Sequence, residues 1–299
     1  MTHRDEFRAR VKGTVVPMPT PFNDDLSVDL EGVRTYTSFL IESGVQTISP
    51  LGTTGEFFTM TPQEHREVMK AVVEEAAGRA VVIAGAGHSG TAVANGLVRY
   101  AQETGADAVL VCAPYYYHSS PEAIFHHYRT LAEENDIGIV IYSNREFMDN
   151  LELVDRLASL PNIVGVKEAT GSYPLYQQWC EHHGDKVVVI GGGSMKHFLW
   201  GNLWGSPAYF ASVANFCPQV ELDFLRHLEK GDLEAAKRIV LEIEAPYMEV
   251  AIKHDWFASL KAAQEMFGLP GGPSRLPVVT VSQAGRQELR DVLTRIGLL

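Results

Sequence analysis

The sequence predicts a (β/α)8 barrel followed by a C-terminal helical extension. Eight short apolar runs recur along the chain as far as Ser212, and stretches of helical character separate them. Strands that alternate with helices are typical of a parallel sheet, and eight closely spaced units match a closed barrel better than an open sheet. After about Asn215 the remaining segments look helical. We therefore expect a barrel domain at residues 1–228 and a helical extension at residues 229–299.

The eight apolar runs are the expected strands. Short apolar runs bounded by turn signals indicate strands that are buried on both faces, as in a parallel sheet. The runs are Thr14–Met18, Gln46–Ser49, Val81–Ala84, Ala108–Cys112, Gly138–Tyr142, Ile163–Val166, Val187–Ile190 and Ala208–Ser212.

Helix signals support this alternation. Thr61 can cap a helix that has Pro62 at its first position and Glu64 at its third, which is a capping-box arrangement. Beyond the last expected strand, four further segments look helical, and a loop rich in glycine and proline at 268–273 separates the last two. They are Pro218–Glu229, Asp232–Glu244, Val250–Phe267 and Ser282–Ile296.

The bulk composition restricts the possible partners. The chain has 299 residues, of which 45% are hydrophobic, so it can bury a large core. Its formal net charge of −12 argues against nucleic acid or an anionic membrane surface as the main partner. The three cysteines lack metal-like spacing, so we expect neither a disulfide framework nor a metal site. Because no long apolar run and no apolar signal core occur, we expect a soluble cytoplasmic protein.

One stretch points directly to chemistry. The apolar residues Ile163–Val166 run straight into Lys167. Burial of a lysine lowers its pKa and frees the amine as a nucleophile, so Lys167 can form a Schiff base at the mouth of a barrel. The structural alternative is a lysine at a strand end that extends its ammonium to solvent.

Further candidate residues follow other expected strands. Gly52, Thr53 and Thr54 follow the second strand, where a glycine lets the backbone approach a ligand and where hydroxyl and N–H groups suit a carboxylate. Tyr142 ends the fifth strand and can transfer protons, although a lone tyrosine is more often a packed aromatic. The carboxyl ends of parallel strands form the active-site face of a barrel. We also expect Phe210, in the eighth strand, to contact a substrate.

Two other patterns have weaker functional meaning. Gly85–Gly90 fits the spacing of a dinucleotide-binding fingerprint, but eight units fit a barrel better, and we interpret it as a turn at the barrel rim. The three adjacent tyrosines Tyr115, Tyr116 and Tyr117 follow the fourth strand and exceed what a core needs, which suggests a rim or an interface.

Taken in order, these residues resemble the signatures of the N-acetylneuraminate lyase/dihydrodipicolinate synthase family of the Schiff-base class I aldolase superfamily. Gly13–Phe22, Gly52–Glu56, Tyr142 and Val166–Gly171 carry the resemblance, which covers nearly the whole barrel. It implies a (β/α)8 barrel with a C-terminal helical extension that assembles as a homotetramer, a dimer of dimers. It also implies a 2-oxo acid substrate and no metal or organic cofactor.

The resemblance assigns roles residue by residue. Lys167 would form the Schiff base and Tyr142 would move protons. Thr53 and Thr54 would bind the substrate carboxylate. A further tyrosine would reach in from a neighbouring subunit; Tyr116 is the best match, although the triple tyrosine leaves the register open by one.

The chain departs from the family pattern after Tyr142. Dihydrodipicolinate synthases carry Tyr-Asn-x-Pro-x-Arg there, and the arginine helps to bind the second substrate. This chain has Tyr-Ser-Asn-Arg-Glu-Phe, so Phe147 stands at the position of that arginine and Arg145 is displaced by two residues. Because a phenyl ring cannot form charge-assisted hydrogen bonds, we expect condensation of the lysine pathway to be negligible, with Arg145 as the remaining candidate for substrate binding.

Two short stretches favour another branch of the family. Gly55–Phe58 and Ser212–Phe216 resemble 5-dehydro-4-deoxyglucarate dehydratases. The main expectation is therefore a Schiff-base lyase that dehydrates or cleaves a 2-keto-3-deoxy or 4-deoxy-5-oxo sugar acid. The alternatives are a 4-hydroxy-tetrahydrodipicolinate synthase that condenses pyruvate with aspartate semialdehyde, and a barrel that binds a 2-oxo acid without turnover.

Overall fold

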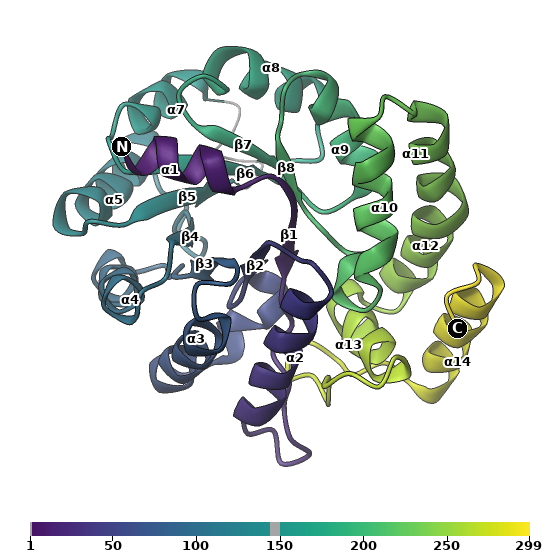
Figure 1. The fold of residues 1–299 in the computed structure, drawn as a ribbon. Coiled ribbons are helices and arrows are strands. Elements are labelled where there is room, and N and C mark those ends of the chain that lie inside the picture. Colours follow the sequence, from purple (N-terminus) through teal and green to yellow (C-terminus); the bar gives the residue numbers. More distant parts are fainter. Residues whose placement is uncertain (1, 144–149) are drawn as a thin grey trace.

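A closed barrel of eight parallel strands forms the centre of the molecule, as the sequence predicts (Figure 1). The structure is a computed structural model that describes residues 2–143 and 150–299. Each strand pairs with its sequence neighbours, and β8 pairs with β1 to close the barrel. The strands are β1 (Gly13–Pro17), β2 (Thr47–Ser49), β3 (Val81–Gly85), β4 (Ala108–Cys112), β5 (Gly138–Tyr142), β6 (Ile163–Glu168), β7 (Val188–Gly191) and β8 (Ala208–Phe210).

Helices surround the barrel (Figure 1). The expected capping box is confirmed, because the Thr61 hydroxyl accepts from the backbone N–H of Glu64 and the Glu64 side chain accepts from that of Thr61. The helices of this part are α1 (His3–Arg10), α2 (Leu30–Glu42), α3 (Pro62–Ala76), α4 (Thr91–Thr104), α5 (Pro121–Glu134), α7 (Leu151–Ala158), α8 (Tyr173–His183), α9 (Met195–Leu203) and α10 (Pro218–Glu229), with short turns η1 (Thr53–Gly55), η2 (Phe57–Thr59) and η3 (Val213–Asn215).

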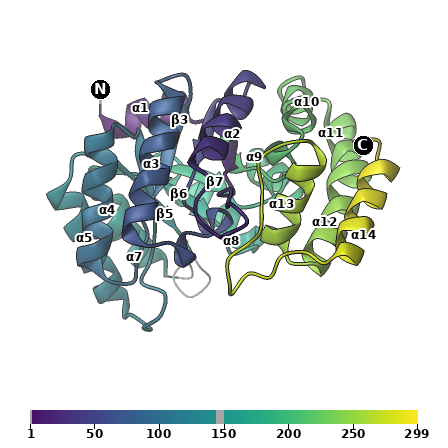
Figure 2. The ribbon, with the colours of Figure 1, turned by 90° about the horizontal axis from the view of Figure 1, so that it is seen from below.

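The C-terminal extension is helical, as expected, but its helices are divided differently. It contains α11 (Leu233–Ile239), the π-helical η4 (Val240–Glu244), α12 (Ala245–Lys253), α13 (Trp256–Met266) and α14 (Gln283–Arg295). The expected single helix over Val250–Phe267 is wrong, because Asp255 has a φ of 69° and caps α13 by accepting from Phe257 and Ala258. In Figure 2, α13 lies on the barrel side of α12 and α14. The division of the chain at residues 228 and 229 stays a prediction.

Helix α1 closes the amino end of the barrel. Phe7 and Val11 belong to the apolar cluster inside the barrel, together with inward residues of the strands such as Val164. The guanidinium of Arg4 fixes the helix from outside, since it donates to the carbonyls of Ile163 at 2.9 Å and Leu160 at 2.6 Å. With the amino end filled in this way, the carboxyl end remains for a site.

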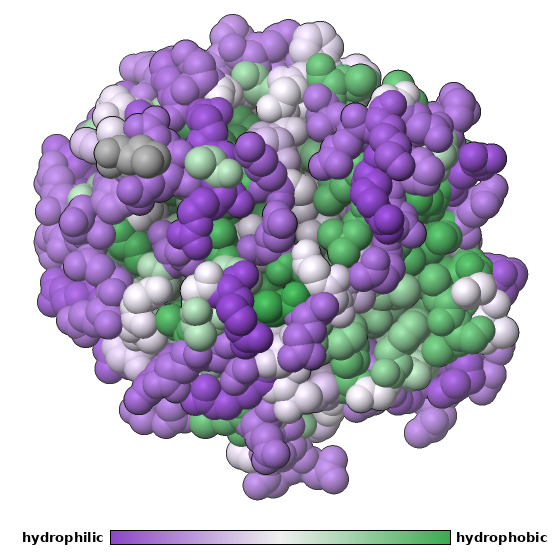
Figure 3. Space-filling model, viewed as in Figure 1, coloured by the Kyte–Doolittle hydropathy of each residue, from purple (hydrophilic) through white to green (hydrophobic). Residues whose placement is uncertain are grey.

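Most of the molecular surface in Figure 3 is hydrophilic, and apolar residues gather mainly over the C-terminal helices at the right. Within residues 2–143 and 150–299, no helix is long and apolar enough to cross a membrane.

Strand β6 contains an irregularity that decides which side chains enter the barrel. Ile139 of β5 pairs with Ile163, but the next residue, Val140, pairs with Gly165, so that Val164 is passed over. Val164 lies in the inner cluster. A Cβ at Gly165 would stand 3.2 Å from the Phe7 ring, so position 165 also faces inward. Two successive inward positions shift the alternation of the strand by one residue.

The shifted alternation turns Lys167 into the barrel. Val166 packs in the outer core, and the next residue therefore faces inward. In an uninterrupted strand, Val164 and Lys167 would face opposite sides because they are three residues apart. The bulge thus allows both a packed inner valine and an inward lysine on the same strand.

Candidate active site

Lys167 stands at the carboxyl end of the barrel interior, between two aromatic rings. It pairs in register with Tyr142 of β5 on one side and with Ile190 of β7 on the other. Its Nζ lies 4.3 Å from the centre of the Tyr142 ring and 3.9 Å from the centre of the Phe210 ring. The structure therefore brings together three of the residues that the sequence singles out.

The environment of Lys167 favours its neutral form. Burial of the amine lowers the pKa of Lys167 from its ordinary value, and the nearby Tyr142 partly opposes this effect. No ion pair with Lys167 is found among the described residues. A neutral amine is the nucleophile that imine formation requires, and the ring faces can stabilise the cationic iminium that follows.

Glu168 anchors the end of β6 from the outside of the barrel. The side chain is completely buried, and one carboxylate oxygen lies 2.6 Å from His197 Nε2 of α9. The other oxygen accepts from the backbone N–H of Thr170 at 2.8 Å. The ring of His197 stacks on Tyr176 of α8, with centroids 4.7 Å apart. These contacts fix the strand end immediately after the lysine.

Ser143 ties the ends of β5 and β6 together. Its hydroxyl donates to the carbonyl of Lys167 at 2.6 Å and accepts from the N–H of Ala169 at 3.2 Å. Because Ser143 follows Tyr142, this link keeps the tyrosine and the lysine in register. Ser143 was not among the predicted site residues; its position directly after the candidate tyrosine is a signal that could have identified it.

The turn that carries Thr53 and Thr54 follows β2 at the same end of the barrel. Thr54 is buried and Thr53 is half-buried. The turn begins after Leu51, which has a φ of 63°, and ends at Glu56, which has a φ of 55°. Left-handed backbone costs a residue with a side chain roughly 1–2 kcal/mol, so the surrounding structure must enforce this shape. A Cβ at Gly85 would stand 1.9 Å from the Leu51 carbonyl, so β3 needs glycine there.

Glu56 is the buried end of this turn and contacts the C-terminal extension. One of its carboxylate oxygens lies 3.0 Å from Lys261 Nζ of α13, and the other accepts from the N–H of Arg275 at 2.9 Å. This ion pair was not predicted from the sequence. The available signal was the single charge of Lys261 among the apolar residues Leu260, Ala262 and Ala263.

The predicted catalytic residue Tyr116 is not brought into this group. Tyr116 has 91% of its surface exposed and Tyr117 has 76%, and both lie in the segment between β4 and α5. The ring of Tyr115 packs edge-on against Phe57 of η2, with centroids 6.2 Å apart. Arg145 and Phe147 lie outside the described residues.

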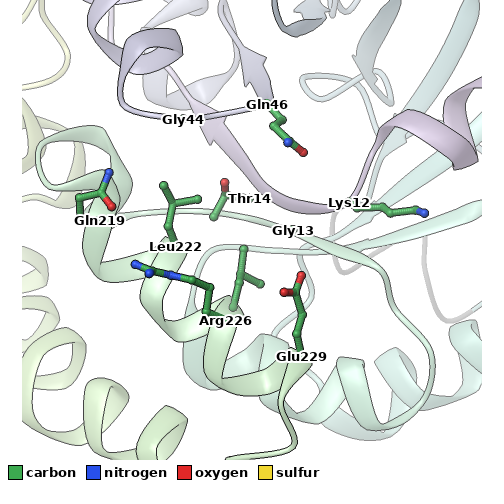
Figure 4. A pocket seen from close by; sticks show the side chains of 10 residues that line it. Lys12, Gly13, Thr14, Gly44, Gln46, Gln219, Leu222, Arg226 and Glu229 are labelled. Atoms are coloured by element: carbon green, nitrogen blue, oxygen red, sulfur yellow. The ribbon is translucent and has the colours of Figure 1, made fainter.

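A cavity in the described part of the chain lies away from Lys167. It has a volume of about 400 Å³ and lies where β1 and β2 begin, beside α10. Figure 4 shows Gln46, Thr14 and Glu229 around it. Active sites of such barrels lie at the carboxyl ends of the strands, so this cavity belongs to a different face from Lys167. In residues 2–143 and 150–299, no three His, Cys, Asp or Glu side chains are placed to hold one metal ion.

A closed (β/α)8 barrel with a desolvated lysine at the carboxyl end of a strand defines the class of Schiff-base lyases. The model of the dihydrodipicolinate synthetase family matches residues 10–296, and this chain belongs to that family.

Relatives cover almost the whole chain. A 4-hydroxy-tetrahydrodipicolinate synthase of Methanothrix thermoacetophila is 33% identical over 290 residues, which is 96% of this chain and 97% of the relative. One of Pelobacter propionicus is 35% identical over 295 residues, or 96% and 99% of the two chains. The crystal structure of dihydrodipicolinate synthase from Aquifex aeolicus matches with a TM-score of 0.89 and 30% identity, covering 96% of this chain and 98% of that one.

These comparisons confirm the family and the lyase class with a lysine Schiff base. They contradict the dehydratase expectation, and they equally oppose the expectation, based on Phe147, that condensation of the lysine pathway is negligible. The structure supplies a physical reason for the error in the dehydratase expectation. Glu56, within the Gly55–Phe58 stretch, is used in a buried ion pair. In the Ser212–Phe216 stretch, the N–H groups of Ser212 and Ala214 donate to Glu221 of α10. Both stretches therefore make contacts within the fold, and their resemblance to dehydratases does not identify the substrate.

The environment of Lys167 predicts a shifted pH dependence for its amine. Burial lowers the pKa of Lys167 from the ordinary lysine value of 10.5. At a given pH below that value, a larger fraction of the Lys167 amine should therefore be neutral and nucleophilic than in an ordinary lysine. The rate of reaction with an amine-directed acylating reagent, followed at the Lys167 peptide by mass spectrometry, should reach half of its maximum well below the midpoint of a model lysine peptide. A midpoint equal to that of the model peptide would contradict this description of the site.

Proposed function

We propose that this protein condenses pyruvate with aspartate semialdehyde, the reaction of a 4-hydroxy-tetrahydrodipicolinate synthase. The names of its relatives support this reaction, and one solved structure of the family, from Acinetobacter baumannii, is complexed with pyruvate. The observation that carries the proposal is the inward Lys167, whose Nζ faces the rings of Tyr142 and Phe210 with a lowered pKa.

The proposed reaction begins with the neutral amine of Lys167. The amine attacks the ketone carbon of pyruvate, and loss of water gives a protonated imine. Loss of a methyl proton then gives an enamine, whose carbon attacks the aldehyde and forms the new carbon–carbon bond. The aldehyde oxygen takes up a proton and becomes a hydroxyl group. The amino group of the semialdehyde portion then attacks the imine carbon and displaces the Lys167 amine, which closes the ring of the product and frees the amine; the water lost in imine formation is the only water released. Tyr142 is proposed to transfer protons in these steps.

Other residues bind the reactants in this proposal. The hydroxyl and N–H groups of Thr53 and Thr54 donate to the pyruvate carboxylate, and Gly52 lets the backbone approach it. Phe210 packs on the face of the iminium carbon. The second substrate brings another carboxylate, and Arg145 is proposed to pair with it. A charge-assisted contact of this kind contributes about 1.5–3 kcal/mol.

Direct assay of the purified protein tests this function. Product should form only when pyruvate and aspartate semialdehyde are both present, as followed by mass spectrometry.

Lys167→Arg should reduce turnover to background, because arginine stays charged and cannot form the imine. Arg145→Ala should raise KM for the semialdehyde roughly ten- to a hundredfold and leave KM for pyruvate unchanged. Turnover of a keto-deoxy sugar acid without any condensation would contradict the proposal.

We also propose that the protein assembles as a homotetramer. Two separate aromatic patches support this assembly. The first contains Tyr116 and Tyr117, which are largely exposed. In the second, the ring of Trp200 packs against Tyr173 and Trp204, with centroids 5.8 and 6.2 Å away. Exposed apolar patches mark interfaces, and a dimer of dimers needs two of them.

The tyrosine patch predicts a defect that depends on a hydroxyl group. If Tyr116 reaches the site of a neighbouring subunit, Tyr116→Phe should lower kcat by about tenfold or more while the oligomer stays intact. The matched variant Tyr117→Phe tests the register: it should keep wild-type kcat if Tyr116 is the residue that reaches the site, and a lowered kcat only in Tyr117→Phe would assign the role to Tyr117. Sedimentation combined with steady-state kinetics measures both. An active monomer at assay concentrations would contradict the assembly, and a wild-type kcat for Tyr116→Phe would remove Tyr116 from the site.

A further inference from the structure

The turn formed by residues 51–56 cannot keep its shape without outside contacts. Its two ends, Leu51 and Glu56, both have left-handed backbone without being glycine. Such conformations persist only where the surrounding structure enforces them. The turn contains the two threonines to which carboxylate binding is assigned. Whatever enforces its shape therefore also sets the direction of their hydroxyl and N–H groups.

Contacts from the C-terminal extension enforce the far end of this turn. Glu56 is 0% exposed and Lys261 is 2% exposed, and Nζ lies 3.0 Å from the Glu56 carboxylate. The same Nζ donates to the carbonyl of Pro273 at 2.7 Å and lies 4.3 Å from the centre of the Phe22 ring. Lys261 thus joins the turn, the loop after α13 and the segment after β1 in one contact.

Two further contacts brace the same region without replacing that ion pair. The Thr20 hydroxyl donates to the carbonyl of Gly55 at 2.8 Å, and the N–H of Arg275 donates to Glu56 at 2.9 Å. If Lys261 is removed, both contacts leave Glu56 without an ion-pair partner, because Arg275 reaches Glu56 through its backbone N–H and its guanidinium pairs with Glu64. A buried charge without a partner is costly, so Glu56 would have to leave its position, and the left-handed backbone at position 56 would be released.

Lys167 is held by a different set of contacts. Its strand end is fixed by Ser143 and by the Glu168–His197 contact, and neither contact involves the extension. Loss of the Lys261 ion pair should therefore disturb carboxylate binding and leave the chemistry of the amine largely intact.

We propose that Lys261 is a positioning residue for the substrate carboxylate: through Glu56 it holds the Thr53–Thr54 turn in the shape that binds a 2-oxo acid. The inference rests on the proposed function, because it assumes that pyruvate binds at this turn. It makes the C-terminal extension part of the substrate-binding apparatus.

The test compares variants of the ion pair by two readouts. The first is the pyruvate concentration that gives half-maximal trapping by borohydride, and the second is the trapping rate at saturating pyruvate. In Lys261→Met the half-saturating concentration should rise about tenfold or more, while the saturated rate should stay near that of the wild type. Lys261→Arg should restore much of the affinity because it keeps the charge.

Two controls make the result specific. Lys253→Met removes an ion pair of the same extension, with Glu288 on the surface, and should leave both readouts unchanged. If Lys261→Met does not fold, Glu56→Gln combined with Lys261→Met leaves no buried charge. Because the contacts of Nζ with position 56 and with Pro273 are still lost, half-saturation should rise, but by less than the roughly tenfold expected for the single variant. A folded variant with wild-type half-saturation overturns the inference. Absence of an adduct in the wild type would instead overturn the proposed function.

Discussion

The site depends on one irregularity in β6, where the pairing with β5 skips Val164. At Val164 the strand places two successive positions toward the barrel axis, and every side chain beyond that point changes its side. Lys167 then faces inward, and its neighbour Glu168 faces outward, where it is buried against His197. If the strand were regular, the lysine would lie in the outer core and the glutamate at the mouth, and no amine would be available for a Schiff base.

This geometry also explains how the fold tolerates a lysine whose amine is desolvated. Burying an ammonium without a counter-ion is costly, and burial lowers the pKa of Lys167. The same loss of solvation that opposes the charge makes the amine nucleophilic. The rings of Tyr142 and Phe210, within about 4 Å of Nζ, offer polarisable faces to the cation that forms during the reaction. Stability and reactivity are thus set by the same neighbours.

Sequence patterns predicted the features that depend on residues close together in the chain. The barrel, Lys167, Tyr142 and the strand ends follow from apolar runs and their turn signals. The inward direction of Lys167 could not be derived, because simple alternation from Val164 gives the opposite side. The partnership of Glu56 and Lys261, 205 residues apart, has no local signature either. The dehydratase expectation rested on short stretches whose residues serve packing, and relatives over the whole chain overturned it. A role for Tyr116 depends on another subunit, which one chain does not contain.

The most direct test of this account is a crystal structure of the protein after reduction with borohydride in the presence of pyruvate. We predict continuous density from Lys167 Nζ to the former ketone carbon, inside the barrel and between the rings of Tyr142 and Phe210. The carboxylate of the adduct should accept hydrogen bonds from the turn at Thr53 and Thr54. An adduct on another lysine, or a carboxylate directed away from that turn, would contradict the account.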